Sequence, residues 1–237
     1  MKLIVCDFDG TYFTDPNNIL INNQYINNFR KQGNLFMLSS GRSYKSLLEM
    51  TKTYNIEFDY LSCCDGSILY DNKGNILIKF ELNNSILKKF LSLKKYAKIE
   101  RIQYSYQDDY YKAEKEDYLI GCNLVLENKE ITKKFLTEFY KLQKEYPDYD
   151  FLKYTHDEIT YFCLKNKGIN KSSTVNYLEK NLNLDYQDIY VFGDNENDYP
   201  MLSCYQSYCI GNVSEKLKQV AIKSYNQVYE FLKEKQF

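Results

Sequence analysis

Three short apolar segments of the chain each end abruptly in polar residues. They lie at residues 2–6, 34–39 and 188–192, and runs of this length bounded by turn-forming residues predict buried β-strands. Stretches with helical periodicity lie between and after them, at residues 22–31, 43–54, 171–181 and 215–223. Apolar strands that alternate with amphipathic helices predict an α/β fold with a doubly wound parallel sheet, whose ligands bind beyond the carboxyl ends of the strands.

The middle of the chain follows a different pattern. Helical periodicity occurs at residues 84–96 and 131–145, and strand patterns occur at residues 99–106, 118–127, 149–154 and 158–164. The first of these strands alternates apolar with polar residues, which indicates one solvated face and an antiparallel sheet. We therefore predict an inserted α+β domain with the element order αββαββ. The predicted division is a catalytic core of residues 1–80 and 167–237 and an insert of residues 81–166.

Composition narrows the class of protein. The 237 residues include 31 Lys and Arg against 32 Asp and Glu, and this net charge of -1 argues against nucleic acid as a partner. No apolar run reaches the roughly 18 residues that a membrane span needs, and the N-terminus turns acidic too early for a signal peptide, so we expect a cytoplasmic protein without membrane contact. The sequence carries no signal for an oligomeric state.

Few residues other than carboxylates are available for chemistry. The seven cysteines form no Cys-x-x-Cys pair, which argues against a zinc site or a disulfide framework. The chain has one histidine, so a histidine-rich metal cluster is excluded. Any catalytic chemistry must therefore depend mostly on Asp and Glu.

Two carboxylates follow the first predicted strand. Asp7 and Asp9 are two positions apart, and Gly10 after them allows a sharp turn of the backbone close to a ligand. Such a pair suits a division of roles, in which one carboxylate is nucleophile and metal ligand and the other is acid and base. The alternative is an acidic turn that caps the next element.

Two other positions carry groups that can bind phosphate. Ser40 and Gly41 follow the second strand, where a hydroxyl and backbone N–H groups at a helix N-terminus can hold a phosphoryl oxygen. N-capping by serine explains the same residue equally well. Lys171 begins a predicted helix, where its ammonium can neutralise a phosphate and a nucleophile together. Single lysines, however, are usually only solvated.

The third strand runs into the acidic segment Gly193-Asp194-Asn195-Glu196-Asn197-Asp198. Its hard oxygen ligands, with no histidine or thiolate among them, suit Mg²⁺. We therefore predict Mg²⁺ as the cofactor. The alternative is an Asn- and Asp-rich loop that caps the next helix.

These four elements, in this order on one predicted core, resemble the motifs of the haloacid dehalogenase (HAD) superfamily. The resemblance is strongest to its Cof-type sugar-phosphatase branch, in which a cap is inserted between the second and third motifs. The segment from Asp7 to Thr11 matches the first motif, Ser40 the second, Lys171 the third and residues 193–198 the fourth. The resemblance implies a Rossmann-like core, and the αββαββ insert is similar to the family's C2B cap.

Three departures from the family pattern leave the substrate open. Tyr12 stands where the family usually has Leu, and Asp65-Gly66-Ser67 stands where Asn-Gly-Ala is usual. The usual Asp-Gly-Val near the C-terminus is missing from residues 226–231. None of these changes affects a catalytic position.

The resemblance implies the following roles. Asp7 would attack phosphorus and form an aspartyl-phosphate, and Asp9 would protonate the leaving alcohol and later activate water. Mg²⁺ would be held by the Asp7 carboxylate, the Asp9 backbone carbonyl and Asp194, with Asp198 in support through water or a hydrogen bond. The transferring phosphoryl group would be bound by Ser40, Gly41 and Lys171, with Asn197 beside it.

We therefore expect a Mg²⁺-dependent phosphomonoester hydrolase that acts on small phosphorylated metabolites, such as sugar phosphates or related cofactors. One alternative is a phosphomutase, which is an isomerase. Its fourth motif has a doubled Gly before Asn-Asp, which Gly193-Asp194 does not match. The other alternative is a non-catalytic phosphometabolite-binding protein, in which degraded motifs would be expected.

Overall fold

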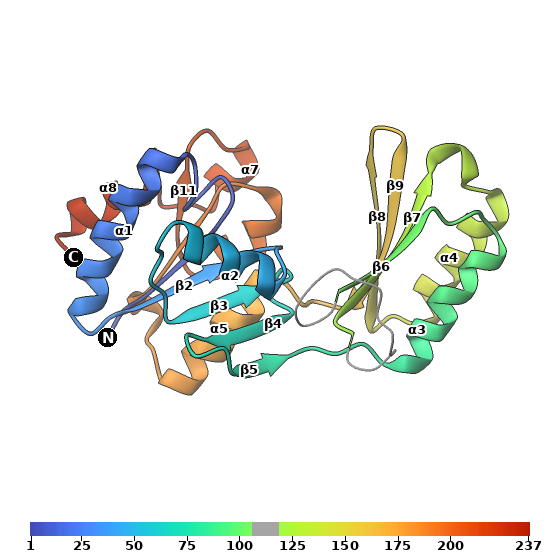
Figure 1. The fold of residues 1–237 in the computed structure, drawn as a ribbon, viewed down its shortest axis with the longest axis horizontal. Helices are drawn as coiled ribbons and strands as arrows, with labels where there is room; N and C mark the ends of the chain where they lie inside the picture. Colours follow the sequence, from blue (N-terminus) through green and yellow to red (C-terminus); the bar gives the residue numbers. More distant parts are fainter. Residues whose placement is uncertain (106–118) are drawn as a thin grey trace. The chain divides into compact units, whose positions relative to one another are not determined.

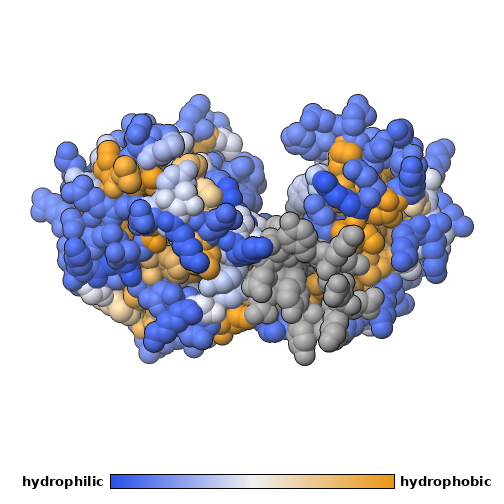
Figure 2. Space-filling view, in the orientation of Figure 1, coloured by the Kyte–Doolittle hydropathy of each residue, from blue (hydrophilic) through white to orange (hydrophobic). Residues whose placement is uncertain are grey.

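The chain divides into two compact units in the computed structural model, which describes residues 1–105 and 119–237. The first unit, here called the core, comprises Met1–Ile78 and Asn170–Phe237, and the second, here called the cap, is Lys79–Ile169 (Figure 1). The expected boundaries at residues 80 and 167 lie close to these. Figure 2 shows hydrophilic residues over much of the visible surface of each unit, with hydrophobic residues between them, most extensively on the cap.

The core is built on one eight-stranded sheet with the order β12-β11-β10-β1-β2-β3-β4-β5. Neighbouring strands from β12 to β3 run parallel, and β4 is antiparallel to β3. The central strand β1 is buried along its whole length, as the apolar sequence Leu-Ile-Val-Cys predicts. The strands are β1 (Leu3–Asp7), β2 (Leu35–Ser39), β3 (Tyr60–Cys63), β4 (Ile68–Asp71), β5 (Ile76–Lys79), β10 (Ile189–Gly193), β11 (Gln206–Ile210) and β12 (Lys223–Tyr225).

Helices cover both faces of this sheet. Successive side chains of a strand point to opposite faces, so Val191 of β10 packs in one cluster with Val175 and Leu178 of α5. The next residue, Phe192, contacts Phe231 of α8 with ring centroids 5.0 Å apart. The predicted doubly wound α/β fold is thereby confirmed. The helices are α1 (Pro16–Lys31), α2 (Tyr44–Thr53), α5 (Lys171–Leu182), α6 (Tyr199–Leu202), α7 (Glu215–Lys218) and α8 (Val228–Lys235).

The cap has the predicted element order αββαββ. Its four strands form an antiparallel sheet in the order β6-β7-β9-β8. Its own core joins the sheet to both helices, with Phe162 of β9 4.8 Å from Phe135 and 4.9 Å from Phe139 of α4 between ring centroids. The elements are α3 (Asn84–Leu91), β6 (Arg101–Ser105), β7 (Gly121–Glu127), α4 (Lys133–Glu145), β8 (Tyr149–His156) and β9 (Ile159–Asn166).

Some predicted element boundaries differ from the structure. The helix expected at residues 22–31 already begins at Pro16, because Asp15 caps its first turn. The helix expected at residues 215–223 ends at Lys218, and Lys223 begins β12, which pairs with Tyr208 of β11. The ends of the two cap strands expected at Tyr106 and Tyr118 lie outside the described residues. Among the described residues, no helix is long and apolar enough to cross a membrane.

Candidate active site

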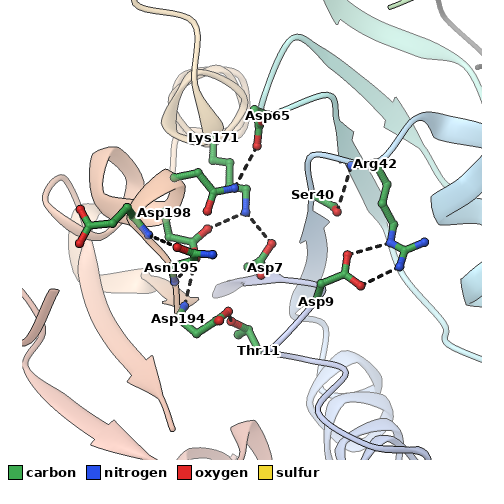
Figure 3. A network of polar contacts seen from close by, with 12 residues as sticks. Asp7, Asp9, Thr11, Ser40, Arg42, Asp65, Lys171, Asp194, Asn195 and Asp198 are labelled. Atoms are coloured by element: carbon green, nitrogen blue, oxygen red, sulfur yellow. Dashed lines mark hydrogen bonds and ion pairs between the residues drawn. The ribbon is translucent and has the colours of Figure 1, made fainter. Parts of the chain in front are cut away.

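Predicted site residues from distant parts of the chain meet at the carboxyl edge of the core sheet (Figure 3). Asp7, Ser39 and Gly193 are the last residues of β1, β2 and β10. Asp7 lies opposite Ser39 in the parallel register, and Cys6 lies opposite Phe192. Because the strands are parallel, the loops that leave them emerge together.

Lys171 lies at the centre of this edge with its ammonium buried. It is the first residue of α5, and its Nζ donates to Asp7 Oδ1 at 2.5 Å and to Asp198 Oδ1 at 2.6 Å. All three side chains are at most 7% exposed. Burial alone would lower the pKa of Lys171, but the two carboxylates outweigh it and the pKa is raised. The lysine is therefore charged, and the alternative of a merely solvated side chain is wrong.

Asp198 joins the acidic loop to this lysine. Its Oδ2 accepts hydrogen bonds from the backbone N–H groups of Asp194 and Asn195, both at 3.0 Å. Its Oδ1 is thereby turned toward Lys171. Thr11 Oγ1 donates to Asp194 Oδ1 at 2.6 Å and holds the third carboxylate. The loop does cap a short helix, Glu196–Asp198, as the alternative supposed. The Asp198 side chain that takes part in this cap also accepts a hydrogen bond from Lys171 in the site.

Gly193 gives Asp198 the room to lie where it does. A Cβ built on Gly193 would lie 2.5 Å from Asp198 Cβ and 2.6 Å from its Cγ. Asp198 is fixed by its three hydrogen bonds and cannot move aside. We expect Gly193→Ala to lower the free energy of unfolding by about 1–3 kcal/mol, the usual cost of overpacking, and to displace Asp198 from Lys171.

Urea unfolding of Gly193→Ala measures this effect. The matched control is Gly33→Ala, since a Cβ at Gly33 meets no atom within 4 Å but the backbone φ there is +84°. The control should lose only the roughly 1 kcal/mol that left-handed backbone costs a residue with a Cβ, and it should keep its activity. A Gly193→Ala protein as stable and as active as the wild type would contradict the crowding at Asp198.

Asp7, Asp194 and Asp198 form a donor set that suits a divalent cation. One oxygen from each lies within 4.8 Å of the others. Burial raises the pKa of Asp7 well above its usual range, and the Asp198 and Asp194 carboxylates raise it further. The pKa of Asp194 is also raised by burial. Three carboxylates against one ammonium leave two negative charges when all are ionised, and a hard dication with oxygen ligands balances them.

Ser40 lies in the loop that follows β2 and is 2% exposed. Its Oγ accepts a hydrogen bond from the Arg42 N–H at 3.2 Å, and its carbonyl accepts from the Asp65 N–H at 3.0 Å. The helix that follows is capped by Ser43, whose Oγ accepts from the Ser46 N–H. Helix capping therefore does not account for Ser40.

Asp65 lies beside two predicted site residues, Asn197 and Gly41. It was not itself predicted as a site residue. Its Oδ1 accepts from Asn197 Nδ2 at 3.2 Å, and it would lie 3.3 Å from a Cβ built on Gly41. Asp65 itself has a backbone φ of +52°. The signal in the sequence was the Asp-Gly pair that follows a strand, which is typical of a turn with positive φ.

The Asp9 carboxylate is paired outside the cluster around Lys171. Arg42 donates to it from Nε and Nη2, both at 2.7 Å, and the Asp9 side chain is 50% exposed. The pKa of Arg42 is raised, chiefly by the hydrogen bond to Asp9. Arg42 is not among the residues predicted for the site, although its place next to Ser40 and Gly41 was a usable signal.

The chain is similar to known proteins over nearly its whole length. A family model described as haloacid dehalogenase-like hydrolase matches residues 4–229. The phosphoglycolate phosphatase of Thermoplasma volcanium is 24% identical over 234 residues, which cover 95% of this chain and 93% of that protein.

Solved structures share the fold over the full length of the chain. A haloacid dehalogenase-like hydrolase from Bacteroides thetaiotaomicron has a TM-score of 0.78 at 18% identity and covers 100% of this chain and 99% of its own. A subclass IIB sugar phosphatase of the same superfamily has a TM-score of 0.70 at 13% identity, with coverage of 100% and 99%. The core and the cap therefore each have a counterpart of the same fold in these two structures.

Proposed function

Because the chain belongs to the haloacid dehalogenase-like hydrolase family, we propose that it is a Mg²⁺-dependent phosphomonoester phosphatase of small phosphorylated metabolites. The family and the phosphatase among its relatives support a phosphatase enzyme. The observation that carries the proposal is the Lys171 ammonium, buried between Asp7 and Asp198. Burying a charge costs free energy. A site that must neutralise a negatively charged phosphoryl group explains why this ammonium is nevertheless buried.

Hydrolysis proceeds in two steps that share Asp7. In the first, a carboxylate oxygen of Asp7 bonds to phosphorus, the ester P–O bond breaks, and the leaving alcohol takes a proton from Asp9. In the second, a water oxygen bonds to phosphorus, the bond to Asp7 breaks, and Asp9 takes a proton from that water. Asp9 therefore starts protonated and is protonated again at the end, inorganic phosphate leaves, and Asp7 is once more a free carboxylate.

The remaining polar groups hold and neutralise the transferring group, since phosphoryl transfer depends mainly on positioning and charge neutralisation. Ser40 is buried and, with Gly41, lies in the loop that follows the carboxyl end of β2, where a hydroxyl and backbone groups can hold phosphoryl oxygens. Lys171 supplies the positive charge, and Asn197 lies beside this loop through its hydrogen bond to Asp65.

The carboxylates fit Mg²⁺, as their donor chemistry and excess charge indicate. The ion would be held by Asp7, Asp194 and the backbone carbonyl of Asp9, with Asp198 in support. When bound, Mg²⁺ neutralises charge on the phosphoryl group and on the nucleophile. Asp198 is already engaged by Lys171 and two backbone N–H groups, which suits a supporting role better than direct ligation.

Sugar phosphates or related cofactors are the substrate class that we propose. The chain shares its fold, cap included, with a sugar phosphatase. An inserted domain can exclude water from the reaction and select the leaving group.

Phosphate release by the purified protein tests this function. We expect release from an aryl phosphate and from some members of a sugar phosphate panel in the presence of Mg²⁺. EDTA should abolish it, because the uncompensated carboxylates then repel an anionic phosphate, and excess Mg²⁺ should restore it. The same panel should also be analysed for isomeric products and for bound ligand.

Three outcomes would contradict the proposal. Phosphate release that is unaffected by EDTA would contradict the requirement for Mg²⁺. Isomer formation without free phosphate would indicate a phosphomutase. Tight binding of an ester without turnover, by protein shown to be folded, would indicate a binding protein.

A further inference from the structure

The guanidinium of Arg42 is held in one orientation by three neighbours. Its Nε and Nη2 donate to the two carboxylate oxygens of Asp9, each at 2.7 Å, and form a bidentate ion pair. Its Nη1 donates to Ser46 Oγ at 3.2 Å, and its Cζ lies 5.5 Å from the centre of the Phe8 ring. Because Asp9, Ser46 and Phe8 contact it from different sides, the guanidinium has little freedom to rotate.

The backbone of Arg42 is fixed to the loop that carries Ser40 and Gly41. Its N–H donates to Ser40 Oγ at 3.2 Å, and its carbonyl accepts from the Cys64 N–H at 2.9 Å. A single residue therefore connects the phosphate-binding loop to the Asp9 carboxylate. Figure 3 shows this connection, with Arg42 between the loop at Ser40 and the side chain of Asp9.

We propose that Arg42 is the positioning residue for Asp9. Its guanidinium fixes both Asp9 oxygens relative to Ser40 and Gly41, so that proton transfer is aimed at the phosphoryl group bound there. The inference rests on the proposed function, in which Asp9 carries the proton. Each carboxylate oxygen has two lone pairs and the ion pair uses one of each, so each oxygen keeps one for a proton.

Asp9 needs such a partner because its own surroundings restrict it little. It follows the end of β1 and its side chain is half exposed, whereas Asp7 is buried. A half-exposed carboxylate can turn about its two side-chain bonds. An error of about 1 Å in a reacting group can cost roughly 10²-fold in rate, so a rigid bidentate partner has a large effect on kcat.

Arg42→Lys tests the geometry while keeping the charge. Lysine is a point donor and cannot form the planar two-point contact. With a sugar phosphate as substrate, we expect kcat to fall by about 10²-fold, the cost of misplacing a reacting group, and KM to change little. If Arg42→Lys does not fold, Arg42→Ala with added guanidinium takes its place, and the free ion should restore kcat.

Arg30→Lys is the matched control. Arg30 forms the same two-point contact with Asp59, from Nε and Nη2 at 2.9 Å each, in a part of the core that carries none of the site residues. This variant should keep the wild-type kcat. A loss of equal size in Arg30→Lys would mean that kcat follows general stability, which would overturn the positioning role.

The double variant with Asp9→Asn separates positioning from direct substrate binding. If Arg42 acts through Asp9, Arg42→Lys should cause no further loss of kcat once Asp9 is replaced. A wild-type kcat in Arg42→Lys, or a rise in KM of the same size with and without Asp9, would overturn the proposal. Absence of phosphate release by the wild type would instead count against the proposed function itself.

Discussion

Asp7→Asn is expected to lower phosphate release by at least about 10³-fold, because the amide cannot act as the nucleophile that forms the covalent intermediate. The change keeps the size and shape of the side chain. Wild-type protein quenched during turnover should carry the mass of one phosphoryl group on the peptide that contains Asp7. The variant should carry none.

The same substitution should leave the fold intact. In the absence of metal, burial disfavours a charged Asp7 and its pKa is raised. When the pKa of a carboxyl group is higher in the folded than in the unfolded protein, the free energy of unfolding falls as the pH rises. A neutral Asn removes that loss, and Lys171 keeps Asp198 as a partner at 2.6 Å. In a chelating buffer at neutral pH, the free energy of unfolding should therefore equal or exceed that of the wild type.

Asp188→Asn is the control for Asp7→Asn. Asp188 also pairs with a lysine, Lys2, at 3.0 Å, but it lies before β10 at the opposite edge of the sheet. This variant should release phosphate at the wild-type rate. An Asp7→Asn protein that keeps more than a few per cent of activity would exclude Asp7 as the nucleophile.

Lys171→Met is expected to damage both stability and activity. Methionine fills a similar volume, but it leaves Asp7 and Asp198 buried without their cation. Breaking a buried ion pair by removing one partner costs about 3–5 kcal/mol, and losing charge stabilisation of a phosphoryl group costs about 10²–10³-fold in kcat. Urea unfolding and phosphate release measure the two effects.

Mg²⁺ gives this prediction a second readout. Because the variant has one positive charge fewer among the three carboxylates, Mg²⁺ should raise its free energy of unfolding more than that of the wild type. Lys2→Met is the control, since its partly exposed pair with Asp188 should be worth less than about 1 kcal/mol. A Lys171→Met protein as stable as the wild type without Mg²⁺ would contradict the role of this lysine in the cluster.

Local patterns of the sequence were sufficient to predict the architecture. The apolar run before Asp7 predicted a buried strand, and β1 is buried throughout. The αββαββ order of the insert followed from periodicities that the cap elements reproduce. Boundaries were less predictable where partners far along the chain decide them. Lys223 is in a strand because its backbone pairs with β11, a contact that no local pattern contains.

The candidate site divides in the same way. The types of its residues and their order along the chain were readable from the sequence, because carboxylates, a hydroxyl and a lysine after strand ends suit phosphate and Mg²⁺ chemistry. The comparisons confirm the superfamily that these motifs resemble, and the fold shared with a subclass IIB phosphatase agrees with the Cof-type branch.

The sequence by itself thus determined the fold class, the inserted cap and the residues available for catalysis, because local periodicity and strand-end chemistry depend on neighbours along the chain. Only the tertiary structure decided which partner each charge has. Asp7 and Lys171 are separated by 164 positions and Arg42 and Asp9 by 33. Their pairing depends on sheet register and burial, which arise only when the strands assemble.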